Sequence, residues 1–383
     1  MLEHHVLVIG GGPVGAALVM ALRGSGLRLG VLEAQAPGTA GTDPRPIALS
    51  HGSRLILERL GVWDELAPVT PILRIHVSQH GGFGRVELDA GEARLPALGY
   101  VLDYGRLAGA LARALIDGRC DYVTGARVTS LEGQHDSVRV AFSRGRGTEQ
   151  ATALLAVVAE GGALAATAEV RARDYGQAAV SARVESRVPH RNVAYERFTP
   201  EGPLALLPAG DALSMIWTTS GDRAEQMCAL GADEFLRRLQ LAFGQRLGAF
   251  TAVGTRTWFP LTLRVAERLA TPRTVAVGNA SQTLHPVAGQ GFNLGLRDAW
   301  ELAAMLRTCD PLRVGDAAFI NAYAARRRLD RRGGVWFTDT LVRLFSNDIA
   351  PLRFARGLGM GLLSAAPPVK DFVVRRMTFG ARG

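Results

Sequence analysis

A glycine cluster at residues 10–15 restricts the fold of this chain more than any other segment does. Gly10-Gly11-Gly12-Pro13-Val14-Gly15 matches the pattern G-x-G-x-x-G, which is weak on its own because glycine-rich turns are common. The predicted elements on either side of the motif strengthen its interpretation. The apolar run Val6–Ile9 predicts a buried strand before the cluster, and residues 13–23 predict an apolar helix after it. With a second predicted strand at Leu27–Glu33, the N-terminus is expected to form a β-α-β unit.

This unit has the features of a dinucleotide-binding site. Glycines at the turn let a pyrophosphate approach the backbone, and the free N–H groups of the helix N-terminus favour its negative charge. Glu33 closes the second strand about twenty residues on, where its carboxylate can accept hydrogen bonds from both ribose hydroxyls and repel a 2′-phosphate. We therefore predict FAD or NAD rather than NADP, with a ligand-free strand-turn-helix as the alternative. Because no second such motif follows a predicted strand, a tightly bound FAD suits the chain better than two nucleotide sites.

Related elements recur along the chain. Apolar runs that end in glycine at 154–162 and 274–278 predict further strands of the nucleotide-binding type, and a long helix is expected over 291–307. A helix is also expected over Pro46–Leu60. Between these segments, alternating apolar and polar residues at 72–79, 83–89, 178–188 and 193–198 predict antiparallel strands. The interleaving indicates two domains woven together rather than placed in series.

Charge and composition argue against several other classes. The 383 residues include 44 Lys and Arg against 35 Asp and Glu, a net charge of +9, but the basic residues are spread out rather than concentrated as in a nucleic-acid binder. The 3 cysteines lie far apart, which argues against a disulfide framework or a zinc site. We find no signal-peptide pattern and no apolar stretch of the about 18 residues that a membrane span requires. We therefore expect a cytoplasmic protein that binds no nucleic acid.

A second glycine-rich block resembles a known family. It begins Gly278-Asn279-Ala280-Ser281-Gln282-Thr283-Leu284-His285-Pro286 and continues through Gly289-Gln290-Gly291-Phe292-Asn293. The block resembles the G-D-A-A-H-x-x-x-P-x-x-G-Q-G-x-N signature of group A FAD-dependent aromatic monooxygenases. Asp43–Ser50 resembles the arginine-containing segment of that family, and Glu196–Pro208 resembles a strand pair of its substrate domain. Within the family, the 278–284 segment and the stretch 338–347 are similar to the hydroxylases of ubiquinone biosynthesis, especially 2-polyprenyl-6-methoxyphenol hydroxylase.

The resemblance implies an α/β fold of the para-hydroxybenzoate-hydroxylase type. In such a fold a Rossmann-like FAD-binding domain is interleaved with an antiparallel β-sheet substrate domain and a helical C-terminal part. The expected ranges are 1–70, 101–170 and 271–315 for the FAD-binding domain, 71–100 and 171–270 for the substrate domain, and 316–383 for the helical region.

The resemblance also implies a reaction. NAD(P)H would act as a transient reductant of FAD, and dioxygen would give a flavin C4a-hydroperoxide that hydroxylates a polyprenylated phenol, most closely 2-polyprenyl-6-methoxyphenol. No metal is required. Other proteins of ubiquinone biosynthesis are expected partners. Because residues 340–383 are both basic and apolar, we also predict peripheral contact with the inner face of a membrane.

Site residues follow from the same resemblance. Predicted catalytic positions at the flavin ring are His285, Pro286, Gln290 and Asn293, with a merely structural hydrogen bond as the alternative role of His285. Tyr175 is the predicted substrate contact, with core packing as the alternative. Cofactor contacts are predicted for Gly10, Gly12, Pro13, Val14, Gly15, Glu33, Arg45, Val128, Glu160, Gly161, Asn279, Gly289, Gln290, Gly291, Phe292 and Asn293.

Three positions depart from the family pattern. Glu160 and Asn279 each stand where an Asp is usual, and Tyr104-Gly105 replaces a frequent Asn-Arg pair. Three alternatives therefore stay open. The chain is a sibling hydroxylase acting at another ring position, a hydroxylase of a small soluble phenol, or an FAD-binding, non-catalytic subunit of a biosynthetic complex.

Overall fold

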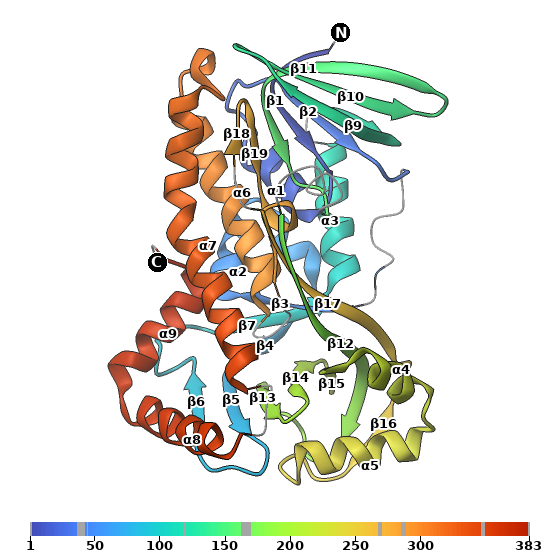
Figure 1. Cartoon of the computed structure of the whole chain (residues 1–383), viewed down its shortest axis with the longest axis vertical. Coiled ribbons are helices and arrows are strands. Elements are labelled where there is room, and N and C mark those ends of the chain that lie inside the picture. Colours follow the sequence, from blue (N-terminus) through green and yellow to red (C-terminus); the bar gives the residue numbers. More distant parts are fainter. Residues whose placement is uncertain are drawn as a thin grey trace.

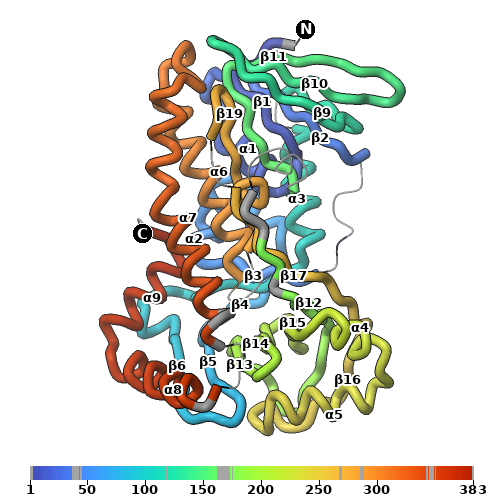
Figure 2. Tube along the Cα trace, viewed as in Figure 1, coloured from blue at the N-terminus to red at the C-terminus, as the bar shows by residue number. Residues whose placement is uncertain are grey.

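The computed structural model of the protein describes residues 2–36, 43, 45–117, 120–161, 170–266, 270–284, 289–345 and 349–381. Within these residues the strands form two large sheets, one above the other in Figure 1, and a small sheet between them. A long C-terminal helix runs beside both large sheets, as the Cα trace in Figure 2 also shows.

The first sheet contains the strands of the nucleotide-binding type. They are β1 (Leu2–Ile9), β2 (Leu29–Glu33), β8 (Asp121–Thr124), β9 (Ala126–Gly133), β10 (Val138–Arg144), β11 (Gly147–Val158), β18 (Ala270–Thr271) and β19 (Thr274–Ala276). Their order is β18-β19-β11-β1-β2-β8, with β1 parallel to both neighbours and β9–β10 extending antiparallel from β11. Val6–Ile9 is buried throughout, which explains its unbroken apolar run, because helices and strands cover both faces of a central parallel strand.

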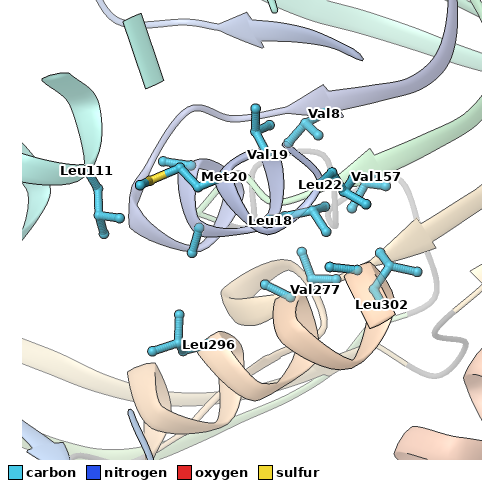
Figure 3. Close-up of a cluster of buried hydrophobic side chains, with 14 of the residues drawn as sticks. Val8, Leu18, Val19, Met20, Leu22, Leu111, Val157, Val277, Leu296 and Leu302 are labelled. Carbon is cyan, nitrogen blue, oxygen red and sulfur yellow. The ribbon is translucent and has the colours of Figure 1, made fainter. Parts of the chain in front are cut away.

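One face of this sheet is covered by three apolar helices. They are α1 (Pro13–Ala21), α3 (Tyr104–Ile116) and α6 (Gln290–Thr308). Figure 3 shows the resulting core, in which Val8 and Val157 of the sheet, Leu18 of α1, and Leu296 and Leu302 of α6 form one cluster. The β-α-β unit and the long helix predicted near residue 291 are therefore confirmed.

The second sheet is mostly antiparallel. Its strands are β5 (Arg74–Gln79), β6 (Arg85–Asp89), β12 (Val170–Ser186), β13 (Val193–Thr199), β14 (Gly202–Ala209), β15 (Ala212–Ser220), β16 (Phe250–Val253), β17 (Thr257–Ala266) and β20 (Gln282–Thr283). The order is β20-β17-β12-β15-β14-β13-β5-β6, in which β13 and β5 are parallel. On one face, Val180, Met215 and Trp217 pack against α4 (Gly221–Ala229) and α5 (Ala232–Phe243). The opposite face is left to line a cavity.

The expected helix over Pro46–Leu60 is wrong in its first part. Residues Pro46–Ser50 form β3, which pairs antiparallel with β7 (Gly99–Asp103), and β7 in turn pairs with β4 (Thr70–Ile72). Helix α2 (His51–Arg59) begins only after Ser50, whose Oγ accepts a hydrogen bond from the N–H of Ser53 at 3.2 Å. A partner strand about fifty residues away decided this segment, and helical periodicity carries no information on such a partner.

The C-terminal part is helical, as predicted. Helix α7 (Ala317–Phe345) leads to α8 (Ala350–Ala365) and α9 (Pro367–Phe379), which lie beside β5 and β6 in Figure 1. Met360 of α8 and Val374 of α9 are buried against Val86 and Leu88 of β6. Among the described residues, no helix is long and apolar enough to span a membrane. The predicted domain ranges remain a prediction.

Close packing of α1 on the sheet generates a test of the fold. A Cβ added to Gly15 would collide with the carbonyl oxygen of Gly10, whereas a Cβ on Gly361 of α8 would meet no atom within 4 Å. We expect Gly15→Ala to lower the free energy of unfolding by about 1–3 kcal/mol through overpacking. The same change at Gly361 should raise it by about 0.5–1 kcal/mol, because alanine favours a helix over glycine.

Urea denaturation of both variants beside the unchanged protein makes the comparison. An equal effect of the two substitutions would contradict the close contact between α1 and β1.

Candidate active site

The glycine turn leaves an open groove at the N-terminus of α1. Gly10 has φ +103°, and a Cβ there would lie 2.7 Å from the backbone nitrogen of Glu160. By contrast, a Cβ on Gly12, the N-cap of α1, would meet nothing within 4 Å. Pro13 is the first residue of the helix. The first N–H groups of a helix have no intrahelical acceptor, so the groove suits an anionic group such as a pyrophosphate.

Glu33 is held beside this turn. Its Oε2 accepts a hydrogen bond from the N–H of Gly11 at 2.6 Å, and its Oε1 accepts one from the N–H of Gln35 at 2.8 Å. A carboxylate fixed here by backbone donors is placed as a ribose-binding residue requires. Tyr122 of β8 borders the same spot, since a Cβ on Gly11 would approach its ring to 3.2 Å. Val128 lies on β9, a strand that contacts β2, and its adenine contact stays a prediction.

Parallel pairing brings the third predicted segment to the turn. The N–H of Ala159 donates to the carbonyl oxygen of Ile9 at 2.8 Å, which places Glu160 directly beside Gly10. A Cβ on Gly161 would meet open space. These residues, 150 positions from the glycine turn, therefore lie next to it.

The second glycine block packs against the first. Gly278 lies in a 3-10 turn, η3 (Gly278–Ala280), with φ +62°, and an added Cβ would come within 3.2 Å of the side chain of Val14. The N–H of Gly278 donates to Oδ2 of the buried Asp298 at 3.1 Å. Asp298 also accepts hydrogen bonds from Gln282 (2.9 Å) and Arg327 (2.7 Å). Asn279 itself is exposed.

The start of α6 is tied down by one side chain. Gly289 is the N-cap, with φ +58°. The buried amide of Asn293 donates to the carbonyl oxygens of Ala48 (3.0 Å) and Gly289 (2.6 Å) and accepts from the N–H of Ser50 (2.8 Å) and the hydroxyl of Ser53 (2.7 Å). Its side chain therefore holds the helix start, and its predicted role at the flavin ring stays a prediction.

The other residues predicted to contact the flavin ring fall into two groups. His285 and Pro286 lie outside the described residues. Gly291 and Phe292 line a cavity that begins at this helix start, as does Gly289, and Gln290 opens the helix beside them. Their cofactor and catalytic roles remain predictions.

Arg45 lines the same cavity, at its end near α6. Its guanidinium donates to both carboxylate oxygens of Asp43 at 2.9 Å, and this hydrogen bonding lowers the pKa of Asp43 and raises that of Arg45. Arg45 also lies over the ring of Phe259, 5.6 Å from its centroid. Tyr104 is a neighbour on the cavity wall, and burial raises the pKa of its hydroxyl.

The cavity has a volume of about 640 Å³ and lies between the second sheet and the C-terminal helices. On the sheet side, one row of register partners crosses five strands and faces the cavity: Val77, Glu196, Ala205, Ile216 and Ser181. On the helix side the wall is apolar, formed by Phe337, Leu341, Met360, Leu363, Val373 and Met377. The cavity is therefore largely apolar, and the glycine-rich start of α6 forms part of its wall.

Two cavity residues were missed by the sequence interpretation, Glu196 and Tyr104. Glu196 belongs to the Glu196–Pro208 segment that resembles the family, but the sequence interpretation did not select it as a site residue. Ala194, Glu196 and Phe198 lie at every second position of β13 and face the same cavity. That alternation placed a carboxylate among apolar side chains and could have identified it. The backbone of Tyr175 lies in β12, but its side chain is outside the part of the chain that the structure describes. In that part, no group of three or more His, Cys, Asp or Glu side chains could hold a metal ion.

Comparison with known proteins agrees with this geometry. The family model described as an FAD binding domain matches residues 3–332. The ubiquinone hydroxylase UbiL of Rhodospirillum rubrum is 37% identical over 97% of this chain and 88% of its own length. The 3-demethoxyubiquinol 3-hydroxylase of Escherichia coli is 31% identical over 93% of each chain.

A solved structure shares the whole fold. The p-nitrophenol 4-monooxygenase PnpA from Pseudomonas putida superimposes with a TM-score of 0.77 over 100% of both chains at 16% sequence identity, which confirms the predicted fold class. Taken with the sequence relatives and the two glycine-rich helix starts, this likeness shows that the chain belongs to the FAD-binding-domain family of FAD-dependent monooxygenases that includes the ubiquinone hydroxylases.

Proposed function

We propose that this protein hydroxylates a polyprenylated phenol on the route to ubiquinone, with 2-polyprenyl-6-methoxyphenol as the substrate that the sequence motifs favour. NAD(P)H would supply the electrons and dioxygen the inserted atom. One of the two relatives is named as a 3-hydroxylase of 3-demethoxyubiquinol and the other only as a ubiquinone hydroxylase, so the ring position is the most specific part of this proposal.

The apolar cavity is the observation that carries the proposal. Its volume of about 640 Å³ lies within the range for drug-sized ligands, roughly 300–1,000 Å³, and its largely apolar lining suits a ring with an attached apolar chain. A small soluble phenol would leave most of the apolar wall formed by α7, α8 and α9 without contact. The shape of the cavity therefore favours a prenylated substrate over a small one.

The chain's own residues would hold FAD and orient the reaction. Bound FAD supplies the redox chemistry that activates dioxygen. The turn at Gly12 and the carboxylate of Glu33 suit the pyrophosphate and ribose, and the N-terminus of α6 can stabilise negative charge on the flavin ring. The C-terminal helices would exclude water from the ring end of the cavity.

A strain that lacks the gene tests this function. We expect it to accumulate one prenylated phenol that the purified, FAD-loaded protein converts to a product one oxygen atom heavier, with stoichiometric NAD(P)H oxidation. Mass spectrometry identifies both compounds and the ring position. Normal ubiquinone and no accumulated precursor would contradict the proposal, and the absence of phenol-stimulated NAD(P)H oxidation would favour a non-catalytic FAD-binding subunit.

Gly12→Val should remove FAD without unfolding the protein. The new side chain enters open space, so it does not disturb packing, but it occupies the groove at the N-terminus of α1. We expect at least about a tenfold loss of flavin absorbance per chain, which corresponds to about 1.4 kcal/mol of binding free energy. Gly221→Val, an equally unhindered change on α4, is the matched control and should retain FAD. Full flavin content in Gly12→Val would show that the cofactor lies elsewhere.

The proposal extends to a membrane contact through α8. The helix is apolar on two sides: Met360 and Leu363 face the cavity, while Phe354, Leu358 and Leu362, spaced four residues apart, are 61%, 51% and 67% exposed. A helix that separates a cavity for a lipid-like substrate from an exposed apolar stripe is suited to rest on a lipid surface. Arg353 beside the stripe adds positive charge that favours anionic lipid.

Replacing two residues of this stripe tests the contact. Phe354→Ser with Leu362→Ser should weaken cosedimentation with anionic liposomes by about tenfold or more, because exposed apolar area drives insertion. Leu312→Ser is the control, since Leu312 is 85% exposed but lies in η5 (Pro311–Arg313). The 29 residues of α7, about 44 Å of helix, separate η5 from α8. Equal binding of all three proteins, or none at low salt, would leave the stripe without a membrane role.

A further inference from the structure

Glu196 occupies an unusual place in the wall of the cavity. It lies in the middle of β13, between Val77 of β5 and Ala205 of β14, and faces the cavity with them. Its Oε1 is buried and has no hydrogen-bond partner among the described residues. A buried carboxylate oxygen without a partner is unfavourable in the folded state, because the charge of the group loses hydration without compensation.

This environment changes the acid–base behaviour of Glu196. Burial raises its pKa to about 7. A carboxylate with a pKa near the working pH is an effective general base, because it is partly ionised and still basic enough to take a proton. Other titratable or charged residues on the described cavity wall are Arg45, Tyr104, Tyr195 and Arg356, and the side chain of Tyr195 packs in the core on the other side of the sheet. Arg45 is paired with Asp43, and Arg356 donates to the carbonyl oxygen of Leu344 at 2.9 Å.

The strands packed against β13 bring no further charge to this face. His76 and Ser78 flank Val77 on β5 and alternate to the opposite side of the sheet, where Arg197 donates to Ser78. Leu204 and Leu206 flank Ala205 on β14 and are buried in the core on that other side. In the row of register partners that faces the cavity, the polar side chains are therefore Glu196 and, at the far end of the row, Ser181 with its hydroxyl group.

We propose that Glu196 is the catalytic base that accepts the hydroxyl proton of the phenol substrate in this cavity, an inference that rests on the proposed function. In this step the phenol O–H bond breaks, a carboxyl O–H bond forms at Oε1, and the electron pair stays on the phenol oxygen. The charge that develops there increases electron density at the ring carbons ortho and para to it, where an electrophilic oxygen atom is inserted. When the ring regains aromaticity, the C–H bond at the new C–O bond breaks, and its proton leaves with the second oxygen atom of dioxygen as water. Glu196 returns its own proton to the phenol oxygen, so the carboxylate is restored.

Kinetics of Glu196→Gln test this role. Glutamine keeps the size and shape of the side chain but cannot take a proton, so we expect hydroxylation of the prenylated phenol to slow by about 100-fold or more. A ring-fluorinated analogue, whose hydroxyl group is more acidic, should lose much less of its rate in the variant, because a more acidic phenol depends less on a base. Glu87→Gln is the matched control, because Glu87 of β6 is exposed on the other side of the same sheet and should leave both rates unchanged.

The pH profile carries the same information. In the unchanged enzyme the rate with the prenylated phenol should rise as pH increases through about 7, because only the ionised carboxylate accepts a proton. This limb should vanish in Glu196→Gln. A side chain with a merely structural role would affect both substrates alike and would leave the pH profile in place.

Ligand binding gives a readout that does not depend on turnover. A prenylated nitrophenol is a suitable probe, because its phenolate absorbs at longer wavelength than the neutral phenol. At about pH 8, bound to the unchanged protein, it should show the phenolate band, whereas bound to Glu196→Gln it should show the neutral band, since an apolar cavity without a base disfavours the anion. Identical bound spectra in the two proteins would overturn the role of Glu196.

The two readouts separate this inference from the function on which it rests. Equal hydroxylation by the unchanged enzyme and Glu196→Gln would refute the base and leave the function standing. If the unchanged protein hydroxylates no prenylated phenol, the proposed function fails, and the spectra of the bound probe still decide whether Glu196 takes a phenol proton.

Discussion

The close approach of α1 to the end of β1 determines the structure of the predicted cofactor-binding region. There is no room for a side chain between Gly15 of the helix and the carbonyl group of Gly10, so the two elements meet backbone to backbone. The second block repeats this device, because a Cβ on Gly295 of α6 would come within 2.9 Å of the Cα atom of Gly278 and 3.1 Å of Val14. As a result two helices pack tightly at the same edge of the sheet, with two N-termini available for the negative charge of a dinucleotide.

Buried polar side chains then join parts of the chain that are distant in sequence. Three hydrogen bonds of the Asn293 side chain connect the start of α6 with β3 and α2. Asp298, further along the same helix, connects α6 with η3 and with Arg327 of α7. Each of these groups is buried, so leaving a partner unsatisfied would cost roughly 1–3 kcal/mol. The flavin end and the helical C-terminal part are therefore held in one arrangement through α6.

The cavity inherits its shape from this arrangement. Its sheet wall is one face of β5, β13, β14, β15 and β12, and its other wall consists of α7, α8 and α9, which α6 helps to place. Apolar side chains dominate both walls, which makes the position of a carboxylate at Glu196 energetically unfavourable for the empty protein. The presence of this carboxylate in β13 is explained if it interacts with a polar atom of the substrate. The same helices leave an apolar stripe on their outer side, so substrate binding and membrane contact involve a single element, α8.

The sequence by itself determined the local features of this protein. The glycine spacing of residues 10–15 and the carboxylate at Glu33 predicted the β-α-β unit and its dinucleotide site, because these depend on neighbours within about twenty residues. The FAD family followed from the resemblance of the block from Gly278 to Asn293, and the order of predicted elements along the chain indicated the interleaved fold. Only the tertiary structure decided that Pro46–Ser50 is a strand, that the Asn293 side chain serves the loop, and that Glu196 faces a cavity beside Arg45 and Tyr104. Those outcomes depend on strand register and helix packing between residues that are 50 to 250 positions apart in the sequence. Local periodicity does not identify the distant strand or helix with which a segment will pack.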